Sequence, residues 1–180
     1  MARCNKTAYA ILGLISKQPA SGYDIKKKLA SMSKWYWSES NAQIYPILKR
    51  MEAQGCLSSE LDTSSGARQR RIYQITPDGM KKLIAWLQQP VEPPTHRDEF
   101  FLKLNLAQHL TQDEMIKHLT QFQQRICDEL NHIKHIQELI QQTHQDRPDY
   151  NYLTLSYQYA LSVWQAKADW CQQSLDSLGA

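Results

Sequence analysis

The segment Trp37–Gly55 carries amide, phenol and cationic side chains at helical spacing, a combination that can hydrogen-bond to the edges of DNA bases. These side chains belong to Asn41, Gln43, Tyr45, Lys49 and Arg50. An apolar row on the other side of the predicted helix consists of Ile44, Ile47 or Leu48, and Met51. A helix with two such faces can bury one in a core and press the other into a DNA groove. An ordinary surface helix is the alternative interpretation of this segment taken alone.

Hydroxyl and basic groups near this segment are suited to holding DNA phosphates, contacts that position a protein on the duplex. We expect this role for Tyr23, Lys34, Ser38 and Arg50. Three arginines, Arg68, Arg70 and Arg71, cluster at the end of a polar loop between two predicted strands. Because neighbouring strand residues point to opposite faces, at least one of Arg70 and Arg71 faces solvent. We expect these arginines to reach a phosphate or the minor groove.

Aromatic side chains offer a second kind of chemistry, the binding of a small aromatic effector between subunits. The candidates for this site are Trp86, Tyr157, Trp164 and Trp170, with Tyr159 beside them. Packing of the same rings in the core of a dimer is the simpler interpretation.

Other combinations of reactive side chains point to surface or core roles. Asp128, His132 and His135 follow an i, i+4, i+7 spacing that can hold a divalent ion. They lie in a polar stripe, so a solvated face is the favoured interpretation, and neither a metal nor another cofactor is expected. Cys127 has no flanking cation pair, which favours a buried, inert thiol over a redox switch. No phosphate-binding loop, G-x-S-x-G or zinc-protease helix occurs, so the sequence does not predict an enzyme.

The elements that would position the basic groups follow the order of a winged helix-turn-helix. Helices are predicted over Lys6–Ser16, after the cap residue Ser21, and from a cap near Ser38 or Ser40 to Gly55. Two strands, Cys56–Leu61 and Arg70–Thr76, form a hairpin, and Thr76-Pro77-Asp78-Gly79 starts a fourth helix that continues through Leu87. In this order the third helix can enter the major groove while the hairpin reaches the backbone.

The second half of the chain is predicted to be helical and to dimerise. Residues 90–96 are rich in proline and form the predicted linker between a DNA-binding domain over 1–89 and a helical dimerisation domain over 97–180, which could also sense an effector. Its helices are expected from Arg97 to about Leu110, from the capping signature at Thr111 to about Thr143, and over Tyr150–Ser177. The last helix is apolar on more than one side, which calls for burial against a second copy.

Charge divides the chain in the same way. Residues 1–88 hold 14 lysines and arginines against 6 acidic residues, whereas residues 89–180 hold 7 against 12. A basic half joined to an acidic half suggests a polyanionic partner for the first half alone. The four scattered cysteines form no C-x-x-C and fit free thiols in a reducing cytoplasm. The apolar run Ala8–Ile15 is too short for a membrane span and fits a helix face, so no membrane partner is expected.

Several motifs together resemble the PadR family of bacterial transcription regulators over roughly residues 8–88. The matching residues are Ile11-Leu12-Gly13-Leu14-Ile15, Ser21-Gly22-Tyr23-Asp24-Ile25, Trp37 with Ser40, Ile44-Tyr45-Pro46 with Leu48, Met51-Glu52 with Gly55, Arg70-Arg71 with Tyr73, Ile75-Thr76 with Gly79, and Trp86-Leu87. The helices after Arg97 are similar to the C-terminal region of the larger members, including the virulence-activator type. The sequence departs from the family at Ala42, where glycine is common, and at Ala67, which separates Gly66 from Arg68.

The resemblance implies a homodimeric winged-helix regulator, usually a repressor, that binds a palindromic operator and in some members responds to phenolic or bulky aromatic compounds. The expected fold is mainly α with a small β-hairpin: an N-terminal winged helix-turn-helix and a C-terminal helical dimerisation region. Gln43, Tyr45 and Lys49 are the first candidates for base contacts, followed by Asn41. The alternatives are a helical protein-interaction adaptor and a transcriptional activator of the same fold.

Overall fold

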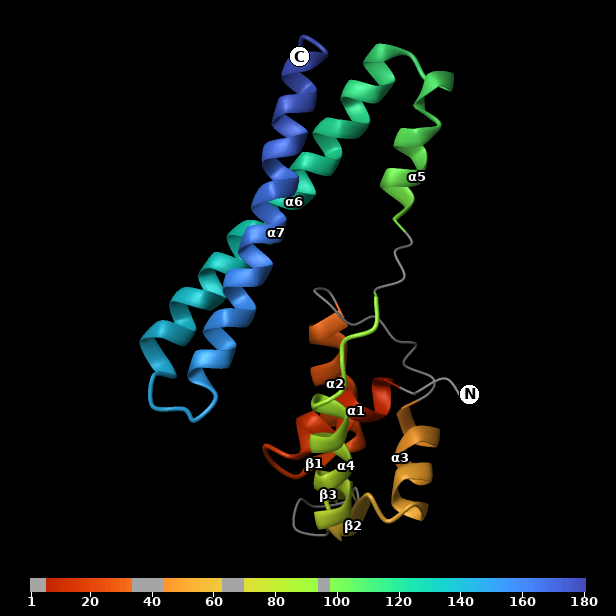
Figure 1. Cartoon of the computed structure of the whole chain (residues 1–180), viewed down its shortest axis with the longest axis vertical. Helices are drawn as coiled ribbons and strands as arrows, with labels where there is room; N and C mark the ends of the chain where they lie inside the picture. The colour runs from red at the N-terminus through yellow and green to blue at the C-terminus, as the bar shows by residue number, and fades with distance from the viewer. Residues whose placement is uncertain (1–5, 34–43, 63–69, 94–97) are drawn as a thin grey trace. The chain divides into compact units, whose positions relative to one another are not determined.

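The computed structural model describes residues 6–33, 44–62, 70–93 and 98–180, which divide into two compact units, Met1–Pro93 and Pro94–Ala180 (Figure 1). The described part of the first unit contains, in order, α1 (Lys6–Ile15), β1 (Ala20–Ser21), α2 (Gly22–Ser33), α3 (Ile44–Ala53), β2 (Leu57–Asp62), β3 (Arg70–Ile75) and α4 (Pro77–Leu87). The second contains α5 (Glu99–Asn105), the short 3-10 helix η2 (Ala107–His109), α6 (Gln112–Thr143) and α7 (Tyr150–Ser177). The mainly helical fold predicted from the sequence is confirmed.

One hydrophobic core joins the helices and strands of the first unit. The apolar row predicted for α3 is fully buried, and both alternatives, Ile47 and Leu48, belong to it with Ile44 and Met51. The other large contributors are Ile11, Leu12 and Ile15 of α1 and Ile25 and Leu29 of α2. Burying each such side chain stabilises the fold by roughly 1.5–3 kcal/mol. The opposite face of α3 is therefore fixed toward solvent.

The predicted hairpin is part of a slightly larger sheet. β2 and β3 pair antiparallel, with Leu57 opposite Ile75 and Asp62 opposite Arg70. Among the described residues the sheet has three strands in the order β1-β3-β2, because Ala20 and Ser21 pair with Tyr73 and Ile72. The prediction of a hairpin alone was therefore incomplete, since a strand of two residues has no alternating pattern to recognise. β1 fixes the start of α2 beside the middle of β3.

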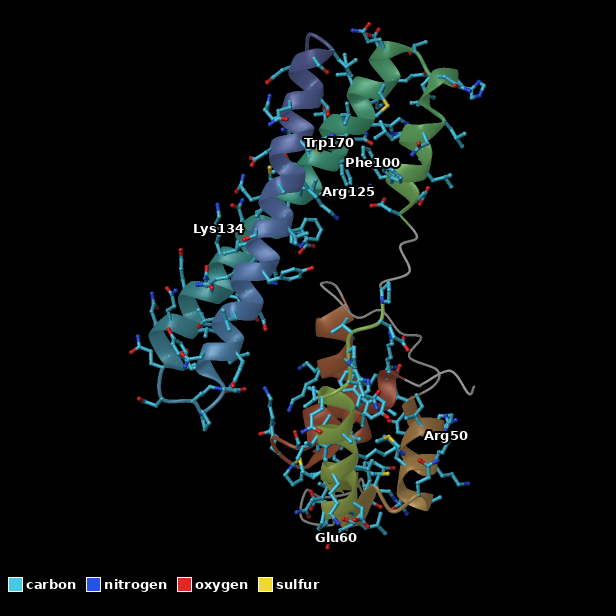
Figure 2. All side chains as sticks on the ribbon, in the orientation of Figure 1. Arg50, Glu60, Phe100, Arg125, Lys134 and Trp170 are labelled. Carbon is cyan, nitrogen blue, oxygen red and sulfur yellow. The ribbon has the colours of Figure 1, made fainter. Side chains whose placement is uncertain are left out.

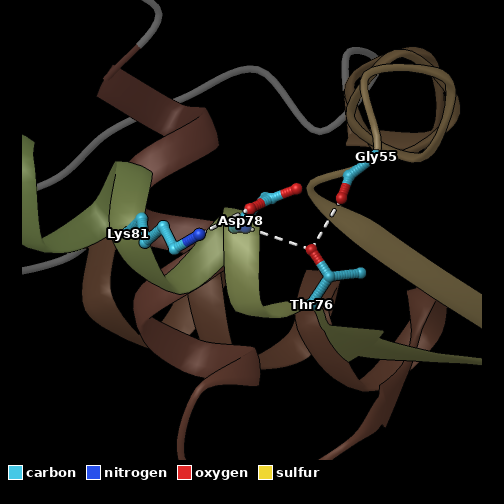
Figure 3. A network of polar contacts seen from close by, with 5 residues as sticks. Gly55, Thr76, Asp78 and Lys81 are labelled. Carbon is cyan, nitrogen blue, oxygen red and sulfur yellow. Dashed lines mark hydrogen bonds and ion pairs between the residues drawn. The ribbon is translucent and has the colours of Figure 1, made fainter.

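Two glycines and a threonine connect α3, the hairpin and α4. Gly55 adopts a φ of 70° and ends α3, with its N–H donating to Glu52 O and that of Cys56 donating to Met51 O. The Thr76 hydroxyl donates to Gly55 O at 2.6 Å and accepts from Gly79 N at 3.0 Å, capping α4 as predicted (Figure 3). Asp78 in the first turn pairs with Lys81 at 3.2 Å. The hydroxyl group of Thr76 thereby links the two ends of the hairpin.

The second unit is built around the pairing of α6 with α7. The predicted capping box of Thr111 and Glu114 begins α6, and Leu119, Ile126, Leu130 and Ile133 are buried along it. The helix predicted from Arg97 to Leu110 is instead divided: α5 ends at Asn105 and η2 follows. On α7 only Cys171 and Leu175 are buried, while Tyr152, Leu155 and Tyr159 are 73%, 60% and 74% exposed. None of the helices in the described residues is both long and apolar enough to cross a membrane.

Candidate nucleic-acid interface

The outward face of α3 presents three of the predicted DNA-contacting residues. Tyr45, Lys49 and Arg50 are exposed, and Tyr45 is 56% exposed despite its large ring. Figure 2 labels Arg50 on this helix. Tyr45 and Lys49 are four residues apart and therefore share a helix face. The burial of the apolar row on the other side holds this face toward solvent.

Tyr45 packs against the beginning of α2 at a glycine. A Cβ atom added to Gly22 would lie 2.7 Å from Cε1 of the Tyr45 ring, closer than carbon atoms pack. The neighbouring Tyr23 is 66% exposed. Because Gly22 has no side chain, the phenol ring of α3 can lie directly against the first turn of α2. This contact brings two predicted site residues, Tyr23 and Tyr45, to adjoining surfaces.

The first turn of α2 also carries a capped and electrostatically coupled carboxylate. Ser21 Oγ donates to Asp24 Oδ2 at 2.6 Å and accepts from the Asp24 N–H at 3.2 Å. The hydrogen bond from the Ser21 hydroxyl is the main cause that lowers the pKa of Asp24, and burial is the next largest effect and opposes it. The positive charges of Arg70 and Lys28 lower the pKa slightly further. Arg70 is exposed at the start of β3, so its charge acts at the surface beside the first turn of α2.

A network of polar side chains connects α3 with the hairpin. Arg71 Nη1 lies 3.5 Å from Glu52 Oε2 and donates to Ser59 Oγ at 3.4 Å. The Ser59 hydroxyl in turn donates to Glu52 Oε1. Burial is the main cause that raises the pKa of Tyr73, with the carboxylate of Glu52 adding to the shift and the cation of Arg71 opposing it. Arg71 is thus engaged inside the unit while its side chain remains 52% exposed.

Five predicted contact residues lie outside the described residues: Lys34, Ser38, Asn41, Gln43 and Arg68. The contacts made by Gly22, Glu52 and Ser59 were not predicted from the sequence. Gly22 stands in the motif Ser21-Gly22-Tyr23-Asp24, but spacing alone does not indicate which ring lies against it. Glu52 follows Lys49 by three residues and lies on the same helix face, which is the signal that could have identified it.

The candidate effector residues have separate packing partners. Trp86 of α4 stacks on Tyr9 of α1 with ring centroids 4.6 Å apart. Trp164 packs against the buried cluster of Ile126, Leu130 and Cys171. The amine of Lys167 lies 4.9 Å from the centroid of the Trp164 ring. Trp86 belongs to the first unit and the other candidates belong to the second.

Trp170 belongs to an aromatic cluster that the sequence did not reveal. Phe100 of α5 stacks on Phe122 of α6 at 3.8 Å between centroids, and it meets Trp170 of α7 edge-on at 6.0 Å (Figure 2). The cluster attaches α5 to the pair of long helices. Tyr157 lies elsewhere on α7, where burial raises the pKa of its phenol.

The other reactive groups do not assemble into a site within the described residues. No three histidine, cysteine or acidic side chains come together there in a way that could hold a metal ion, and Asp128, His132 and His135 are exposed. Cys127, expected to be buried, is only partly buried, because it lies one position away from the inward-facing Ile126. Cys171 on α7 is the fully buried thiol of this region, and burial raises its pKa.

Comparison with known proteins gives matches in both halves of the chain. Residues 11–85 match the profile of the transcriptional regulator PadR-like family, and residues 96–179 match that of the virulence activator alpha C-term region. The chain is similar to the negative transcriptional regulator PadR of Bacillus subtilis (strain 168), with 35% identity over 108 residues. This alignment covers 59% of each protein, so the chain spans less than two thirds of that relative's length.

Two solved structures resemble the chain over nearly its full length. Bacillus subtilis PadR in complex with operator DNA has a TM-score of 0.85 at 26% identity, covering 97% of this chain and 99% of that one. Bacillus subtilis PadR in complex with p-coumaric acid has a TM-score of 0.77 at 27% identity, covering 96% and 98%.

Proposed function

We propose that this chain, which belongs to the PadR-like family of transcriptional regulators, binds a palindromic DNA operator as a homodimer and represses transcription. The family resemblance found in the motifs of residues 8–88 is confirmed by the match over residues 11–85. The proposal includes the cytoplasmic location expected from the cysteine pattern. An enzymatic role has no residue set to support it, whereas the family is one of regulators.

The exposed polar face of α3 is the observation that carries the proposal. Its apolar face is buried in the core, so Tyr45, Lys49 and Arg50 are held outward on a rigid helix. Such a helix is suited to the major groove, where cations and amides pair with base edges. We assign base or groove contacts to Tyr45 and Lys49, together with Gln43 and Asn41 on the preceding segment.

Phosphate contacts are assigned to the groups around this helix. Tyr23 is exposed beside Tyr45, and Arg50 lies one residue after Lys49. Arg70 and Arg71 at the start of β3 supply cations on the hairpin side, joined by Arg68, and Lys34 and Ser38 belong to the segment between α2 and α3. Phosphate contacts fix position and orientation on the duplex, whereas the α3 contacts carry the sequence preference.

Dimerisation is assigned to the second unit. The exposed apolar residues of α7, Tyr152, Leu155 and Tyr159, follow helical spacing and remain largely uncovered by the described residues of this unit. A second copy would bury them, and a symmetric dimer reads two half-sites about 34 Å apart, one helical turn of DNA. The two copies of α3 in such a dimer bind the operator together, with higher affinity and specificity than one copy alone.

A small aromatic effector is the proposed regulator, with Trp86, Tyr157, Trp164 and Trp170 as its candidate binding residues. The complex of a structurally similar protein with p-coumaric acid supports this class of ligand. The virulence-activator match over residues 96–179 keeps transcriptional activation as the alternative. Transcription from the target promoter, measured with and without the protein, decides between repression and activation.

The DNA-binding proposal is tested by the salt dependence of binding. The wild-type protein first selects the double-stranded fragments that it binds from a random-sequence pool. In parallel, its binding to the promoter of its own gene is mapped by footprinting. Lys49→Ala should weaken binding to the selected fragment by removing a groove contact. Arg70→Ala should weaken it and reduce the salt slope by about 0.9, the loss of one phosphate neutralised. Lys81→Ala removes an exposed lysine of α4 that pairs with Asp78 and is the charge-matched control. Unchanged affinity and slope in both test variants would contradict the proposal.

A further inference from the structure

An acidic residue lies on the face of α3 that is proposed to meet DNA. Tyr45, Lys49 and Glu52 are spaced four and three residues apart, which places all three on one side of the helix. The Glu52 side chain is 31% exposed. A carboxylate facing a polyanion weakens binding through charge repulsion. Its presence on this face therefore calls for a role that outweighs the repulsion.

Glu52 has two partners, one on each strand of the hairpin. Its carboxylate accepts from Ser59 of β2 and lies 3.5 Å from the guanidinium of Arg71 on β3. Arg71 also donates to Ser59, so the three side chains form a closed triangle. Within this triangle the carboxylate restricts the directions in which the cation can point.

The triangle leaves part of Arg71 available. Its side chain is 52% exposed, and the contacts above involve only its Nη1 nitrogen. A guanidinium presents five N–H donors in a rigid plane, so one edge can be held by protein while another meets a phosphate. The direction of that free edge is set by Glu52 and Ser59.

We propose that Glu52 is a specificity-determining residue that acts by holding Arg71. In the wild-type protein Arg71 contacts a phosphate only where the sequence-dependent shape of the bound DNA places one along the free edge of its guanidinium, so this contact reads DNA shape and not base edges. The negative charge of Glu52 lowers affinity for DNA of any sequence, and only the contact of Arg71 with a well-placed phosphate offsets this repulsion. The inference rests on the proposed DNA-binding function and adds to it the residue that limits binding to incorrect sequences.

The test compares two variants with the same change of charge. Glu52→Gln keeps the shape of the side chain but removes the charge that holds Arg71, which loosens the guanidinium. Glu60→Gln removes a carboxylate from the exposed side of β2, outside the triangle (Figure 2). Affinity is measured for a fragment selected by the wild-type protein and for a mixed-sequence fragment of equal length. Glu52→Gln should raise affinity for mixed-sequence DNA and lower the selected-to-mixed ratio about tenfold, the scale of one charge-assisted hydrogen bond. Glu60→Gln should leave the ratio unchanged.

The salt slope provides a second readout that a purely structural role would not change. A released Arg71 can neutralise one more phosphate on mixed-sequence DNA, so the slope in Glu52→Gln should steepen by about 0.9. In an Arg71→Gln background, Glu52→Gln should no longer change the ratio or the slope. Ser59→Ala keeps both charges and removes the shared hydroxyl, and we expect a smaller fall in the ratio. This variant tests the inference even if Glu52→Gln proves unstable.

Two kinds of failure can be distinguished. If the wild-type protein shows no preference between selected and mixed DNA, the proposed function fails and this inference fails with it. If the wild-type protein discriminates but Glu52→Gln and Glu60→Gln behave alike, the function stands and the role of Glu52 is overturned. An equal effect of Glu52→Gln with and without Arg71 would also overturn it.

Discussion

At the scale of single residues, a substitution at Gly22, which contacts Tyr45, should change DNA affinity without changing the stability of the fold. Alanine favours helices over glycine by about 1 kcal/mol, so Gly22→Ala in the first turn of α2 should not lower the free energy of unfolding by itself. The new Cβ would lie 2.7 Å from the Tyr45 ring, which must then move. We expect at least a fivefold loss of affinity for the selected DNA at an unchanged melting temperature. Gel shifts and thermal unfolding measure the two quantities.

Gly13→Ala is the matched control for this substitution. Gly13 lies within α1, and a Cβ there meets nothing within 4 Å. The same gain in helix propensity should stabilise the protein by up to about 1 kcal/mol and leave DNA binding unaltered. Equal DNA affinities in the Gly22 and Gly13 variants would show that the position of Tyr45 does not matter for binding.

The hydrogen bond between Ser21 and Asp24 predicts that the free energy of unfolding depends on pH in the acidic range. The pKa of Asp24 in the folded protein lies below its ordinary value of 3.8, mainly because of the Ser21 hydroxyl. A lowered carboxyl pKa stabilises the folded state above pH 3.8, and this contribution is lost as the pH falls through the folded value. Ser21→Ala should cost about 1 kcal/mol at pH 7 as a lost helix cap. Urea unfolding at pH 7 and pH 3 should show a smaller difference between variant and wild type at pH 3.

The sequence predicts which side chains are buried and which are exposed where this follows from the periodicity of a single helix or strand. The buried row of α3 and the outward positions of Tyr45 and Lys49 follow from the 3.6-residue repeat alone. Contacts between elements could not be predicted in this way. The closeness of Gly22 to Tyr45 and of Glu52 to Arg71 depends on how α2, α3 and β3 are placed in space.

At the scale of elements, the junction of β2 with α4 leaves no room for a side chain at Gly79. A Cβ at this position would lie 2.1 Å from the carbonyl oxygen of Cys56, a backbone atom that cannot rotate away. Gly79→Ala should therefore lower the free energy of unfolding by about 2 kcal/mol, since overpacking of this kind exceeds the gain in helix propensity. Urea denaturation measures the loss. Stability equal to that of Gly13→Ala would contradict this account.

Element boundaries were predictable where a cap defined them. Thr76 and the capping box of Thr111 and Glu114 begin α4 and α6 as predicted, because each cap is contained within four residues of sequence. β1 could not be predicted because it exists only through its pairing with β3. The division between α5 and η2 follows Asn105, whose side-chain amide donates to Phe101 O, a local contact of the kind that competes with regular helix hydrogen bonds.

At the scale of the whole molecule, the exposed apolar residues of α7 predict association. Leu155 is 60% exposed, so Leu155→Glu should leave the fold of each unit intact and place a charge in the proposed dimer contact. We expect the dimer dissociation constant to rise at least tenfold, equivalent to about 1.4 kcal/mol. Sedimentation over a range of concentrations measures it. Gln121→Glu adds the same charge to an exposed polar position of α6, away from this row of apolar residues, and is the control.

The same variant links association to DNA recognition. A monomer holds one reading helix and cannot engage two half-sites at once, so its binding loses the advantage of a tethered second site. Leu155→Glu should bind a single half-site normally and a full palindrome no better than a half-site. Wild-type binding of the full palindrome by this variant would indicate that another surface forms the dimer.

The hydroxyl group of Thr76 determines which part of the hairpin can change in length. It ties Gly55, where α3 ends, to the start of α4, while the Thr76 N–H donates to Cys56 O at 3.1 Å. These hydrogen bonds hold the two ends of the hairpin together at a fixed position. The end of the hairpin beyond Asp62 and Arg70 can therefore lengthen or shorten without altering the helices that flank the hairpin. Insertions after Asp62 should be tolerated far better than a single added residue at Cys56.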